Sequence, residues 1–444
     1  MQSPVWHPFT QAKTADPPLK VLSGNGVKLK LEDGRSIIDC ISSWWVNIHG
    51  HGNSEIAQAI YEQAQVLEHV IFAGFTHDPA ENLARAVLKH LPNNLRHVFF
   101  SDNGTTAVET AMKMAYQYWQ NIDMPNRSKF IAFDQGYHGE TVGAMSLGRT
   151  MPFFNRFKSL FFDIDLIPFP ATWDSDTTYG ETEQLALLAV NKLLSNNAQQ
   201  YAGIIVEPLI QGVGGMRMCR IEFMQELEKI IRQAGLLLIY DEVMTGFGRT
   251  GDWFACRKTN TQPDIICLSK GLTGGFLPLA LTITTDEVYQ SFYSDDLQKA
   301  FFHSHSYMGN PLACAAANAS MKLLERNSES FLEMEQMHRQ FSKLWLADID
   351  YLEKHRTCGT IAALDVITND TGHYFNSISL TMRQKFLELG FLMRPLGNTI
   401  YLMPPYCISA DELESAYRAI RQVVTAMFAS RSRVPVLSPP GRTT

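Results

Sequence analysis

The stretch DIICLSKGLTGGFLPLA, residues 264–280, joins an apolar segment to a lysine and a turn rich in glycine. Residues 264–268 form a short apolar run with two isoleucines, which predicts a buried strand. Ser269 and Lys270 follow directly, and residues 271–275 read GLTGG. A lysine that ends a buried strand and precedes such a turn is a candidate for chemistry.

Apolar runs of the same kind recur along the chain and alternate with helical patterns. One helical pattern places Ala107, Val108, Ala111, Met112 and Ala115 on a single face. Strands are predicted at residues 97–100, 129–133, 203–206, 236–240, 264–268 and 280–284. Strands that alternate with helices favour an α/β domain with a mostly parallel sheet.

The two ends of the chain have a different character. Residues 21–39 contain the turn signals GNG and DG, which predict a small β-meander. After Pro311 the pattern predicts a long helix and then smaller α+β elements, with strands at 361–366 and 399–403. We therefore expect the following parts: residues 1–50 and 311–430 as one smaller domain built from both chain ends, 51–310 as the large cofactor-binding domain, and 431–444 as a poorly ordered tail.

Composition and charge narrow the class of protein. The 444 residues are 45% hydrophobic and 19% charged, which is ordinary for a globular enzyme and excludes a wholly disordered chain. A net charge of −7 gives no reason to expect nucleic acid or an anionic membrane as a partner. No apolar run reaches the roughly 18 residues of a membrane span, and the N-terminus lacks the apolar core of a secretory signal. The seven cysteines form no CxxC pair, so we expect thiols in a reducing cytoplasm.

Polar motifs follow several of the predicted strands, at the edge where ligands bind in open parallel sheets. Asp241 follows the apolar run LLLIY, and Lys270 follows the next predicted strand. The sequence Gly-Thr-Thr at 104–106 stands where another strand gives way to a helix. Tyr137 and His138 lie between two glycines after a further strand.

Each motif also has a structural interpretation that the residues alone leave open. Lys270 can be a solvated loop residue, and Asp241 can be a helix cap. Thr106 and Glu109 fit a capping box at an ordinary helix start. The pair at 137–138 can simply pack in a loop.

Taken together, the motifs fit one ligand better than they fit separate structural roles. A helix N-terminus with glycine and threonine donors binds phosphate. A lysine amine forms a Schiff base with an aldehyde, and a carboxylate keeps a pyridine nitrogen protonated. An aromatic side chain can stack on that ring. Phosphate, aldehyde and pyridine on one molecule describe pyridoxal 5′-phosphate (PLP), which is the cofactor that we expect.

In order and spacing, the segments LLLIYDEVMTGFGRTG, PDIICLSKGLTGGFLPLA and FFHSHSYMGNPLACAAA resemble the class III aminotransferases, which are PLP-dependent enzymes of fold type I. The resemblance runs from about residue 4 to about residue 430. It implies a large domain with a mostly parallel seven-stranded sheet and a smaller α+β domain. It also implies that Lys270 is the Schiff-base lysine, that Asp241 is the pyridinium partner, and that Tyr137 stacks on the ring. The glycines after Lys270 are interpreted as letting the backbone approach the cofactor.

The resemblance further implies a homodimer that shares its active sites. The segment HSHSYMGNP is where the neighbouring subunit reaches the phosphate, and Ser306 keeps the hydroxyl of the usual threonine there. The family's phosphate loop is matched by three residues: Gly104, Thr105 and Thr106. Two histidine pairs have metal-compatible spacing but no third ligand, so we expect no metal: His49 with His51, and His303 with His305.

Within the family, three segments resemble the branch that converts 7-keto-8-aminopelargonate (8-amino-7-oxononanoate) to 7,8-diaminopelargonate in biotin biosynthesis. They are VWHPFTQ at 5–11, SSWWVNIHGHGNSEI at 42–56 and RPLGNTIYLMPPYCI at 394–408. The resemblance implies that Trp44 and Trp45 line the pocket for the aliphatic chain, although core packing is also open for them. Arg394 matches the position that binds the substrate carboxylate, where the planar guanidinium suits a bidentate contact.

The amino donor usual in this branch is S-adenosylmethionine. Phe9 stands where many adenosylmethionine-using relatives carry tyrosine, and some relatives use lysine instead. One lost hydrogen bond changes affinity by about tenfold at most, so we expect S-adenosylmethionine, with lysine as the alternative. Met244 departs from the glutamine of many class III relatives, which weakens an assignment to another ω-aminotransferase. Arg249 and Glu207 lie on the family's cofactor-side loops, and we assign neither a definite role.

Two further classes stay open as alternatives. A PLP mutase would share the fold and the cofactor residues but would exchange no amino group with an external donor. A non-catalytic binding protein on this scaffold would be expected to lose Lys270 or Asp241, and both are present.

Overall fold

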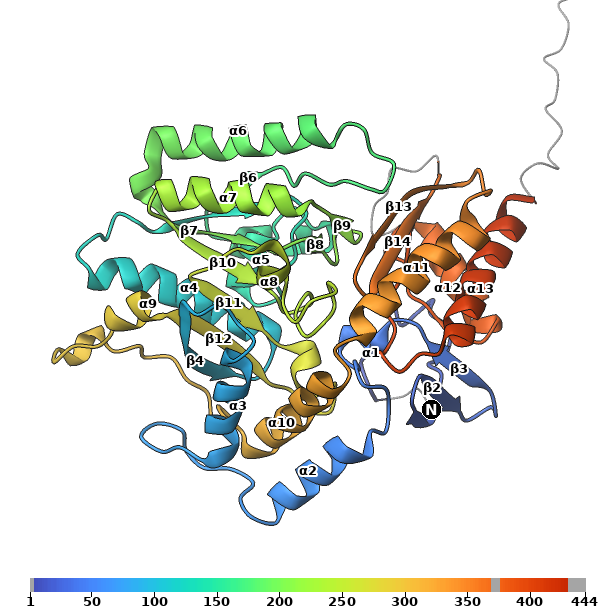
Figure 1. The fold of residues 1–444 in the computed structure, drawn as a ribbon, viewed down its shortest axis with the longest axis horizontal. Helices are drawn as coiled ribbons and strands as arrows, with labels where there is room; N and C mark the ends of the chain where they lie inside the picture. Colours follow the sequence, from blue (N-terminus) through green and yellow to red (C-terminus); the bar gives the residue numbers. More distant parts are fainter. Residues whose placement is uncertain (1–3, 369–375, 430–444) are drawn as a thin grey trace, which may run out of the picture.

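The structure is a computed structural model that describes residues 4–368 and 376–429. At its centre lies a seven-stranded sheet in the order β4-β12-β11-β10-β7-β5-β6 (Figure 1). The strands are β4 (Leu95–Ser101), β12 (Ala280–Thr285), β11 (Ile265–Leu268), β10 (Leu237–Asp241), β7 (Tyr201–Val206), β5 (Lys129–Phe133) and β6 (Asp165–Ile167). Only β12 runs antiparallel to its neighbours within this sheet, so the predicted α/β class with a mostly parallel sheet is confirmed.

Each strand predicted for this sheet is present, with bounds that shift by at most two residues. The strand missed by sequence is β6, which is three residues long and begins with a charged residue, Asp165. So short a segment offers no alternation that a pattern could detect.

The sheet has helices on both faces because successive side chains of each strand point to opposite sides. Ile239 and Cys267 pack with helix α4 (Gly104–Asn121) on one face. Leu238 and Ile266 pack on the other face, in the core that includes α7 (Ile221–Gln233). The remaining helices around the sheet are α3 (Asp78–Leu88), α5 (Val142–Leu147), α6 (Tyr179–Asn197), α8 (Ala255–Thr259) and α9 (Asp286–Gln290).

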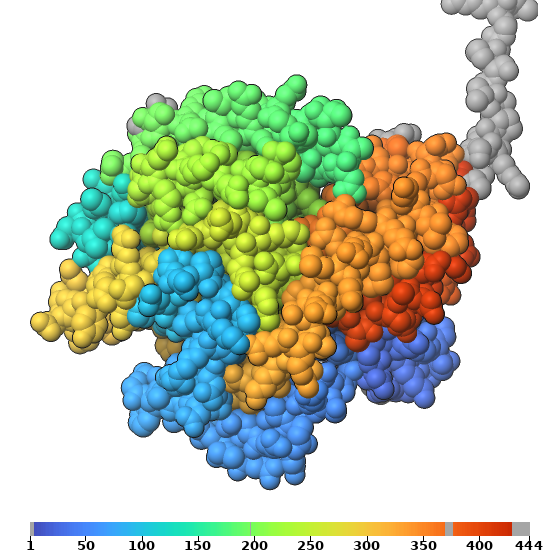
Figure 2. Space-filling model, viewed as in Figure 1, coloured from blue at the N-terminus to red at the C-terminus, as the bar shows by residue number. Residues whose placement is uncertain are grey.

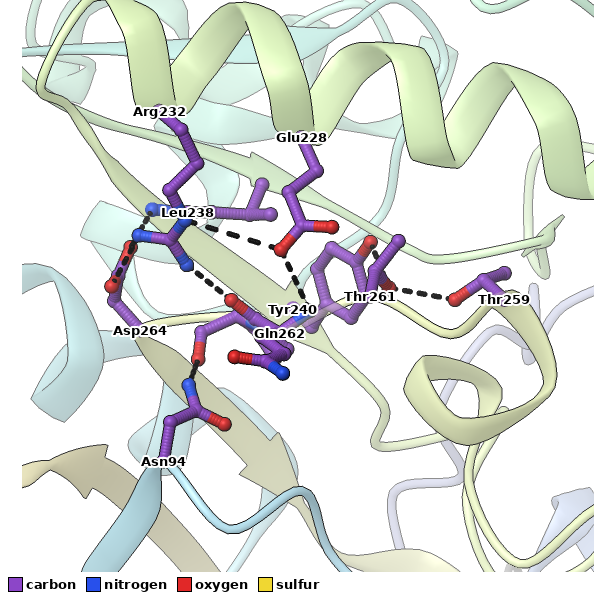
Figure 3. A network of polar contacts seen from close by, with 10 residues as sticks. Asn94, Glu228, Arg232, Leu238, Tyr240, Thr259, Thr261, Gln262 and Asp264 are labelled. Carbon is purple, nitrogen blue, oxygen red and sulfur yellow. Dashed lines mark hydrogen bonds and ion pairs between the residues drawn. The ribbon is translucent and has the colours of Figure 1, made fainter.

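A polar network holds the start of β11 in place relative to the neighbouring strand and helix (Figure 3). Nη1 of Arg232 on α7 donates to both carboxylate oxygens of Asp264, at 2.6 and 2.8 Å. The same carboxylate accepts the backbone N–H of Leu238 on β10 at 2.8 Å. Asn94 donates to the carbonyl of Pro263 from the loop before β4. These contacts hold β11 beside β10, so the residues that follow the two strands come out next to each other.

A smaller unit beside the sheet combines early and late segments of the described chain. One small sheet has the order β1-β2-β3-β15, in which residues 391–392 pair with β3, and another has the order β13-β14-β16. Figure 2 shows the early blue segment lying against the red C-terminal helices. Its elements are β1 (Val21–Asn25), β2 (Lys28–Leu31), β3 (Ser36–Asp39), α11 (Ser330–Leu346), β13 (Leu352–Cys358), β14 (Ile361–Val366), α12 (Ser377–Glu388), β15 (Phe391–Leu392), β16 (Thr399–Leu402) and α13 (Ala410–Ala429). The predicted meander and the two predicted late strands are confirmed.

Helix α10 (Pro311–Arg326) links the two parts of the molecule. It packs against α2 (Ser54–Ala64), α3 and the short helix η3 (Lys270–Thr273), and therefore shares its core with the sheet. The domain boundary at residue 310 stays a prediction. The tail predicted at 431–444 lies outside the described residues.

Candidate active site

The motifs that follow the strands meet in one cavity of about 380 Å³ at the carboxyl ends of β10 and β11. Nine of the residues predicted from the sequence line it: Phe9, Trp44, Trp45, Gly104, Thr105, Tyr137, Asp241, Lys270 and Arg394. Further lining residues include Asn103, His138, Gly139, Glu140, Phe153, Glu207, Val243, Met244 and Tyr401. Parallel neighbouring strands deliver Asp241 and Lys270 to the same edge, as the sequence predicts.

Lys270 is the first residue of η3 and has a left-handed backbone with φ 45°. Ser269, just before it, donates its hydroxyl to the carbonyl of Leu279 at 2.8 Å and so ties the turn to the next strand. The lysine Nζ lies 4.9 Å from the ring centroid of Trp45. Burial lowers the pKa of Lys270, and the negative charges of Asp241 and Glu207 offset only part of this effect. A lysine with a lowered pKa is more readily neutral, which is what a nucleophilic amine requires.

The glycines after Lys270 have a structural role that differs from the predicted approach of the backbone to the cofactor. Of residues 270–275, only Lys270 lines the cavity. A Cβ at Gly274 would lie 2.8 Å from Ile56, and one at Gly275 would lie 2.0 Å from Asn47. Both glycines also have positive φ. They therefore let the turn pack against the chain around residues 47–56 rather than against a cofactor.

Asp241 forms a close pair with His138 inside the cavity. Its Oδ2 lies 2.8 Å from Nδ1 of the histidine, and its Oδ1 accepts the N–H of Val243 at 3.1 Å. Burial by itself lowers the pKa of His138, but the hydrogen bond to Asp241 and the charge of that carboxylate outweigh burial and raise it. The carboxylate is therefore held in one orientation by two contacts, one to the His138 ring and one to the backbone of Val243.

Glu207 is a second buried carboxyl group at the cavity. Its two oxygens accept the backbone N–H groups of Tyr137 at 2.9 Å and of Gly212 at 2.8 Å. Burial raises the pKa of Glu207 to about 7, and the nearby charge of Asp241 acts in the same direction. Its hydrogen bonds fix the backbone of the turn that carries Tyr137, so the side chain shapes the site through its neighbours.

The start of α4 forms the part of the cavity suited to an anion. Gly104 is the first residue of this 18-residue helix, and a Cβ there would lie 2.6 Å from Val243. A Cβ at Gly139 would lie 2.2 Å from Oγ1 of Thr105, which itself lies 2.8 Å from Oγ1 of Thr141. The N-terminal end of a helix carries partial positive charge and N–H donors, which favours a phosphate group.

The capping residue of α4 is Asn103, not Thr106 as one interpretation of the sequence had it. The Asn103 side chain accepts the N–H of Thr106, and the Thr106 hydroxyl accepts the N–H of Asn103, which completes a capping box. Glu109 instead accepts two N–H groups, those of Gly143 and Ala144 at the start of α5. Thr106 does not line the cavity, because this capping role turns its hydroxyl back to residue 103.

Aromatic side chains form one wall of the cavity, and Trp45 within it lies beside Lys270. Trp44 lies 5.6 Å from the ring of Phe9, and the guanidinium of Arg394 lies 4.8 Å from the Trp44 centroid. Nε1 of Trp45 donates to the hydroxyl of Tyr401 at 3.0 Å. Arg394 has no carboxylate partner among residues 4–368 and 376–429. The arrangement suits a ligand with an apolar chain and an anionic end.

The turn that carries the two tryptophans has an uncommon backbone. Residues 42–45, which form α1 (Ser42–Trp45), all have positive φ, between 44° and 78°. Left-handed conformations cost L-residues roughly 1–2 kcal/mol each, so surrounding contacts must hold this turn. Adjacent residues of an extended strand point to opposite faces, whereas a helical turn allows Trp44 and Trp45 to border one cavity.

Two residues singled out by sequence lie away from the cavity. Ser306 is exposed and does not line the cavity of its own chain. Arg249 is buried, with Nη1 2.8 Å from the carbonyl of Pro404 and Nη2 3.4 Å from that of Trp45. Arg249 therefore braces the aromatic wall from behind.

Sequence analysis missed the role of His138, although it noted the residue. Its partner Asp241 lies 103 positions away, and no local pattern joins them.

Among the described residues, no group of three His, Cys, Asp or Glu side chains could hold a metal ion. All seven cysteines are free, and no helix within the described ranges is long and apolar enough to cross a membrane.

Comparison with known proteins gives a consistent result. The family described as aminotransferase class-III matches residues 10–424. The chain is 52% identical to the adenosylmethionine-8-amino-7-oxononanoate aminotransferase of Synechococcus elongatus, over 95% of this chain and 98% of that protein. It is 37% identical to the enzyme of the same name from Anoxybacillus flavithermus, over 95% of this chain and 94% of that one.

Solved structures show the same relationship. The crystal structure of adenosylmethionine-8-amino-7-oxononanoate aminotransferase from Methanocaldococcus jannaschii is similar with a TM-score of 0.87 and 33% identity, covering 95% of this chain and 97% of that one. An amine transaminase from an uncultivated Pseudomonas species, solved in its PLP-bound form, has a TM-score of 0.88 and 27% identity, covering 96% and 99% of the two chains. The family match spans most of the chain, and the chain therefore belongs to the class-III aminotransferases.

Proposed function

We propose that this protein transfers an amino group to 8-amino-7-oxononanoate and so makes 7,8-diaminopelargonate, the step of biotin biosynthesis for which its relatives are named. The observation that carries the proposal is the placement of Arg394 on Trp44, in the cavity where Lys270 lies against the neighbouring Trp45. The substrate has a reacting carbon at one end, an aliphatic chain and a carboxylate at the other end. The cavity offers an amine, an aromatic wall and a guanidinium in that order.

Membership of the class-III aminotransferases implies PLP as the cofactor. The residues present fit it: the start of α4 suits the phosphate, and Gly104 and Gly139 allow the segments around that end to pack closely, because a Cβ at Gly104 would clash with Val243 and one at Gly139 with Thr105. Tyr137 lines the cavity beside Asp241, where its ring can stack on a bound ring. When bound, PLP supplies an aldehyde that combines with amines and a pyridine ring that withdraws electrons.

Three side chains have separate roles in the reaction. Asp241 keeps a proton at the ring nitrogen, and His138 holds the carboxylate in place. Lys270, with its lowered pKa, would move a proton at Nζ between the donor carbon and C4′ of the cofactor in the first half of the reaction, and between C4′ and the acceptor carbon in the second half.

We infer S-adenosylmethionine as the amino donor, because the similar enzymes carry adenosylmethionine in their names. Its sulfonium is a cation, and the faces of Trp44 and Phe9 attract cations in a partly desolvated site. The donor is tested by mixing the purified PLP form with S-adenosylmethionine or lysine separately and following pyridoxamine phosphate spectroscopically. We expect conversion by S-adenosylmethionine. Conversion by lysine alone would assign the alternative donor, and conversion by neither would contradict the proposed function.

We further infer that the protein is a homodimer in which Ser306 of one subunit completes the phosphate site of the other. Ser306 is exposed and flanked by the exposed rings of Phe302 and Tyr307, which are 73% and 67% exposed. Apolar residues this open on a folded chain are typical of a surface that a partner covers.

Subunit mixing tests the shared site. Lys270→Ala and Ser306→Ala variants are each expected to be impaired, the first completely. In a mixed dimer, one site combines the intact Lys270 of one subunit with the intact Ser306 of the other, so activity should return on mixing. Ser306→Thr serves as a control that keeps the hydroxyl. A monomer in sedimentation analysis, or no recovery on mixing, would contradict the inference.

We also infer a reducing compartment, the cytoplasm, because all seven cysteines are free thiols. Cell fractionation with an antibody against the native protein tests this location.

A further inference from the structure

The left-handed turn at residues 42–45 is held by a polar cluster behind the aromatic wall. Ser43 donates its hydroxyl to Oδ2 of Asp39 at 2.6 Å, and Nε2 of His51 lies 2.9 Å from the same oxygen. Oδ1 of Asp39 accepts the N–H of Ile41 at 3.1 Å. One buried carboxylate thus binds groups before, inside and after the turn.

The carboxylate of Asp39 is completely buried yet charged. Burial by itself raises the pKa of Asp39, but the hydrogen bonds from His51 and Ser43 outweigh burial and lower it. A buried charge is stable only where donors surround it, so loss of one donor or of the carboxylate is expected to disturb the whole cluster.

His51 is itself anchored to the smaller unit of the fold. Its backbone N–H donates to the carbonyl of Gly26 at 2.7 Å, and its carbonyl accepts the N–H of Gly26 at 3.0 Å. A Cβ at Gly24 would lie 2.6 Å from Cβ of His51, so the strand β1 approaches the histidine closely. The cluster therefore joins the β1–β2 turn to the turn that carries the tryptophans.

The geometry of the cluster excludes a nucleophilic triad. In such a triad the carboxylate binds Nδ1 of the histidine while Nε2 faces the serine. Here Asp39 contacts Nε2 at 2.9 Å and also accepts the hydrogen bond of the Ser43 hydroxyl, which lies 3.5 Å from the same Nε2. Nδ1 of His51 lies 3.2 Å from the side-chain nitrogen of Asn47. Asp39, Ser43 and His51 are absent from the lining of the active cavity.

We propose that Asp39, acting through Ser43 and His51, is a positioning residue that sets Trp44 and Trp45 for substrate binding. The proposal rests on the proposed function in one respect, namely that the aromatic wall binds the keto acid. The position of the wall itself can be tested without any substrate.

The main variant is Asp39→Asn, with Asp165→Asn as a control. Asp165 also accepts a hydroxyl hydrogen bond, from Tyr201 at 2.7 Å, but it lies on β6 at the edge of the large sheet and does not line the active cavity. Holoenzyme is labelled with 5-fluorotryptophan, and the Trp44 signal in fluorine-19 NMR is assigned with Trp44→Phe. We expect Asp39→Asn to shift or broaden this signal and to raise the KM for 8-amino-7-oxononanoate roughly three- to tenfold, with PLP retained. Asp165→Asn should leave both unchanged.

A second pair of variants keeps the test decisive if Asp39→Asn does not fold. Ser43→Ala removes the hydroxyl but keeps the Cβ at φ 44°, whereas Ser43→Gly also removes the cost of the left-handed backbone. We expect Ser43→Ala to disturb the Trp44 signal and the KM more than Ser43→Gly does.

The outcomes separate the two proposals. A wild-type enzyme that fails to aminate 8-amino-7-oxononanoate contradicts the proposed function, while the Trp44 signal still tests the positioning role. An unchanged Trp44 signal in both Asp39→Asn and Ser43→Ala overturns the positioning role, even if the keto acid proves to be the substrate. The same KM rise in Asp165→Asn would also overturn it, because the effect would then be general.

Discussion

Nδ1 of His138 lies 2.8 Å from Oδ2 of Asp241, and both side chains are buried where β10 ends. The carboxylate is thereby oriented across the cavity floor and has a raised-pKa histidine as its neighbour. The pair gives the buried carboxylate of Asp241 a hydrogen-bond partner, which a buried polar group requires.

We predict that His138→Ala lowers kcat more than it changes the KM for either substrate. A hydrogen bond to a charged group contributes about 1.5–3 kcal/mol, which corresponds to roughly one to two powers of ten in rate if it is lost in the transition state. The matched control is His97→Ala, because His97 makes a similar contact of 2.9 Å with Asp286 outside the active cavity. Steady-state kinetics with wild-type kcat in His138→Ala would exclude the role.

Glu207 gives a prediction about stability and pH. Burial raises its pKa from 4.5 to about 7, so the folded protein keeps this proton while the unfolded chain loses it. The contribution of Glu207 to stability is complete at pH values below its pKa in the unfolded chain. That contribution is lost as the pH rises through its pKa in the folded protein. Between about pH 5 and pH 8 the wild type should therefore lose about 2–3 kcal/mol relative to Glu207→Gln, by denaturant unfolding of the apoenzyme.

The exposed Glu140 is the control for Glu207, because Glu140→Gln should leave the pH dependence of unfolding unchanged. Parallel unfolding curves for wild type and Glu207→Gln across this pH range would show that Glu207 is not buried as a neutral acid.

Arg394 gives a prediction about substrate binding. We expect Arg394→Ala to weaken binding of 8-amino-7-oxononanoate by about one to two powers of ten while PLP binding is unchanged. Arg394→Lys keeps the charge but loses the planar group that lies over Trp44, so its binding should be intermediate. Titration calorimetry distinguishes the three proteins, and wild-type affinity in Arg394→Ala would rule out the carboxylate contact.

Phe9 gives a prediction about the donor. Its ring contacts Trp44 and Phe153, at 5.6 and 5.9 Å, so the aromatic wall is complete without a hydroxyl. If the missing hydroxyl is the only difference from tyrosine-bearing relatives, Phe9→Tyr should tighten S-adenosylmethionine binding by up to about tenfold. The half-reaction rate at increasing donor concentration measures this change, and weaker binding in the variant would argue against the hypothesis.

Patterns local in sequence predicted the fold and the centre of the site. Buried apolar runs marked the strands, and the rule that ligands bind at the carboxyl ends of parallel strands brought Asp241 and Lys270 together. Thr106 shows where such patterns mislead, because its spacing to Glu109 fits a capping box that the neighbouring Asn103 forms instead.

Features that depend on distant contacts could not be predicted in this way. The bond between His138 and Asp241 joins separate loops, and the glycines after Lys270 are needed because residues 47–56 pack against them. The left-handed turn at 42–45 contradicts the local preference of serine and tryptophan, and it exists only because groups such as Asp39 hold it.

The most direct test of the central claim is reduction of the native holoenzyme with tritiated borohydride, followed by peptide mapping. Borohydride fixes a PLP group to the lysine that holds it, so the label reports which amine the cofactor uses. The account predicts label on the peptide that contains Lys270 and none on the same peptide of Lys270→Ala, which should also lack transamination. Label on any other lysine of the native enzyme, or transamination by Lys270→Ala, would contradict it.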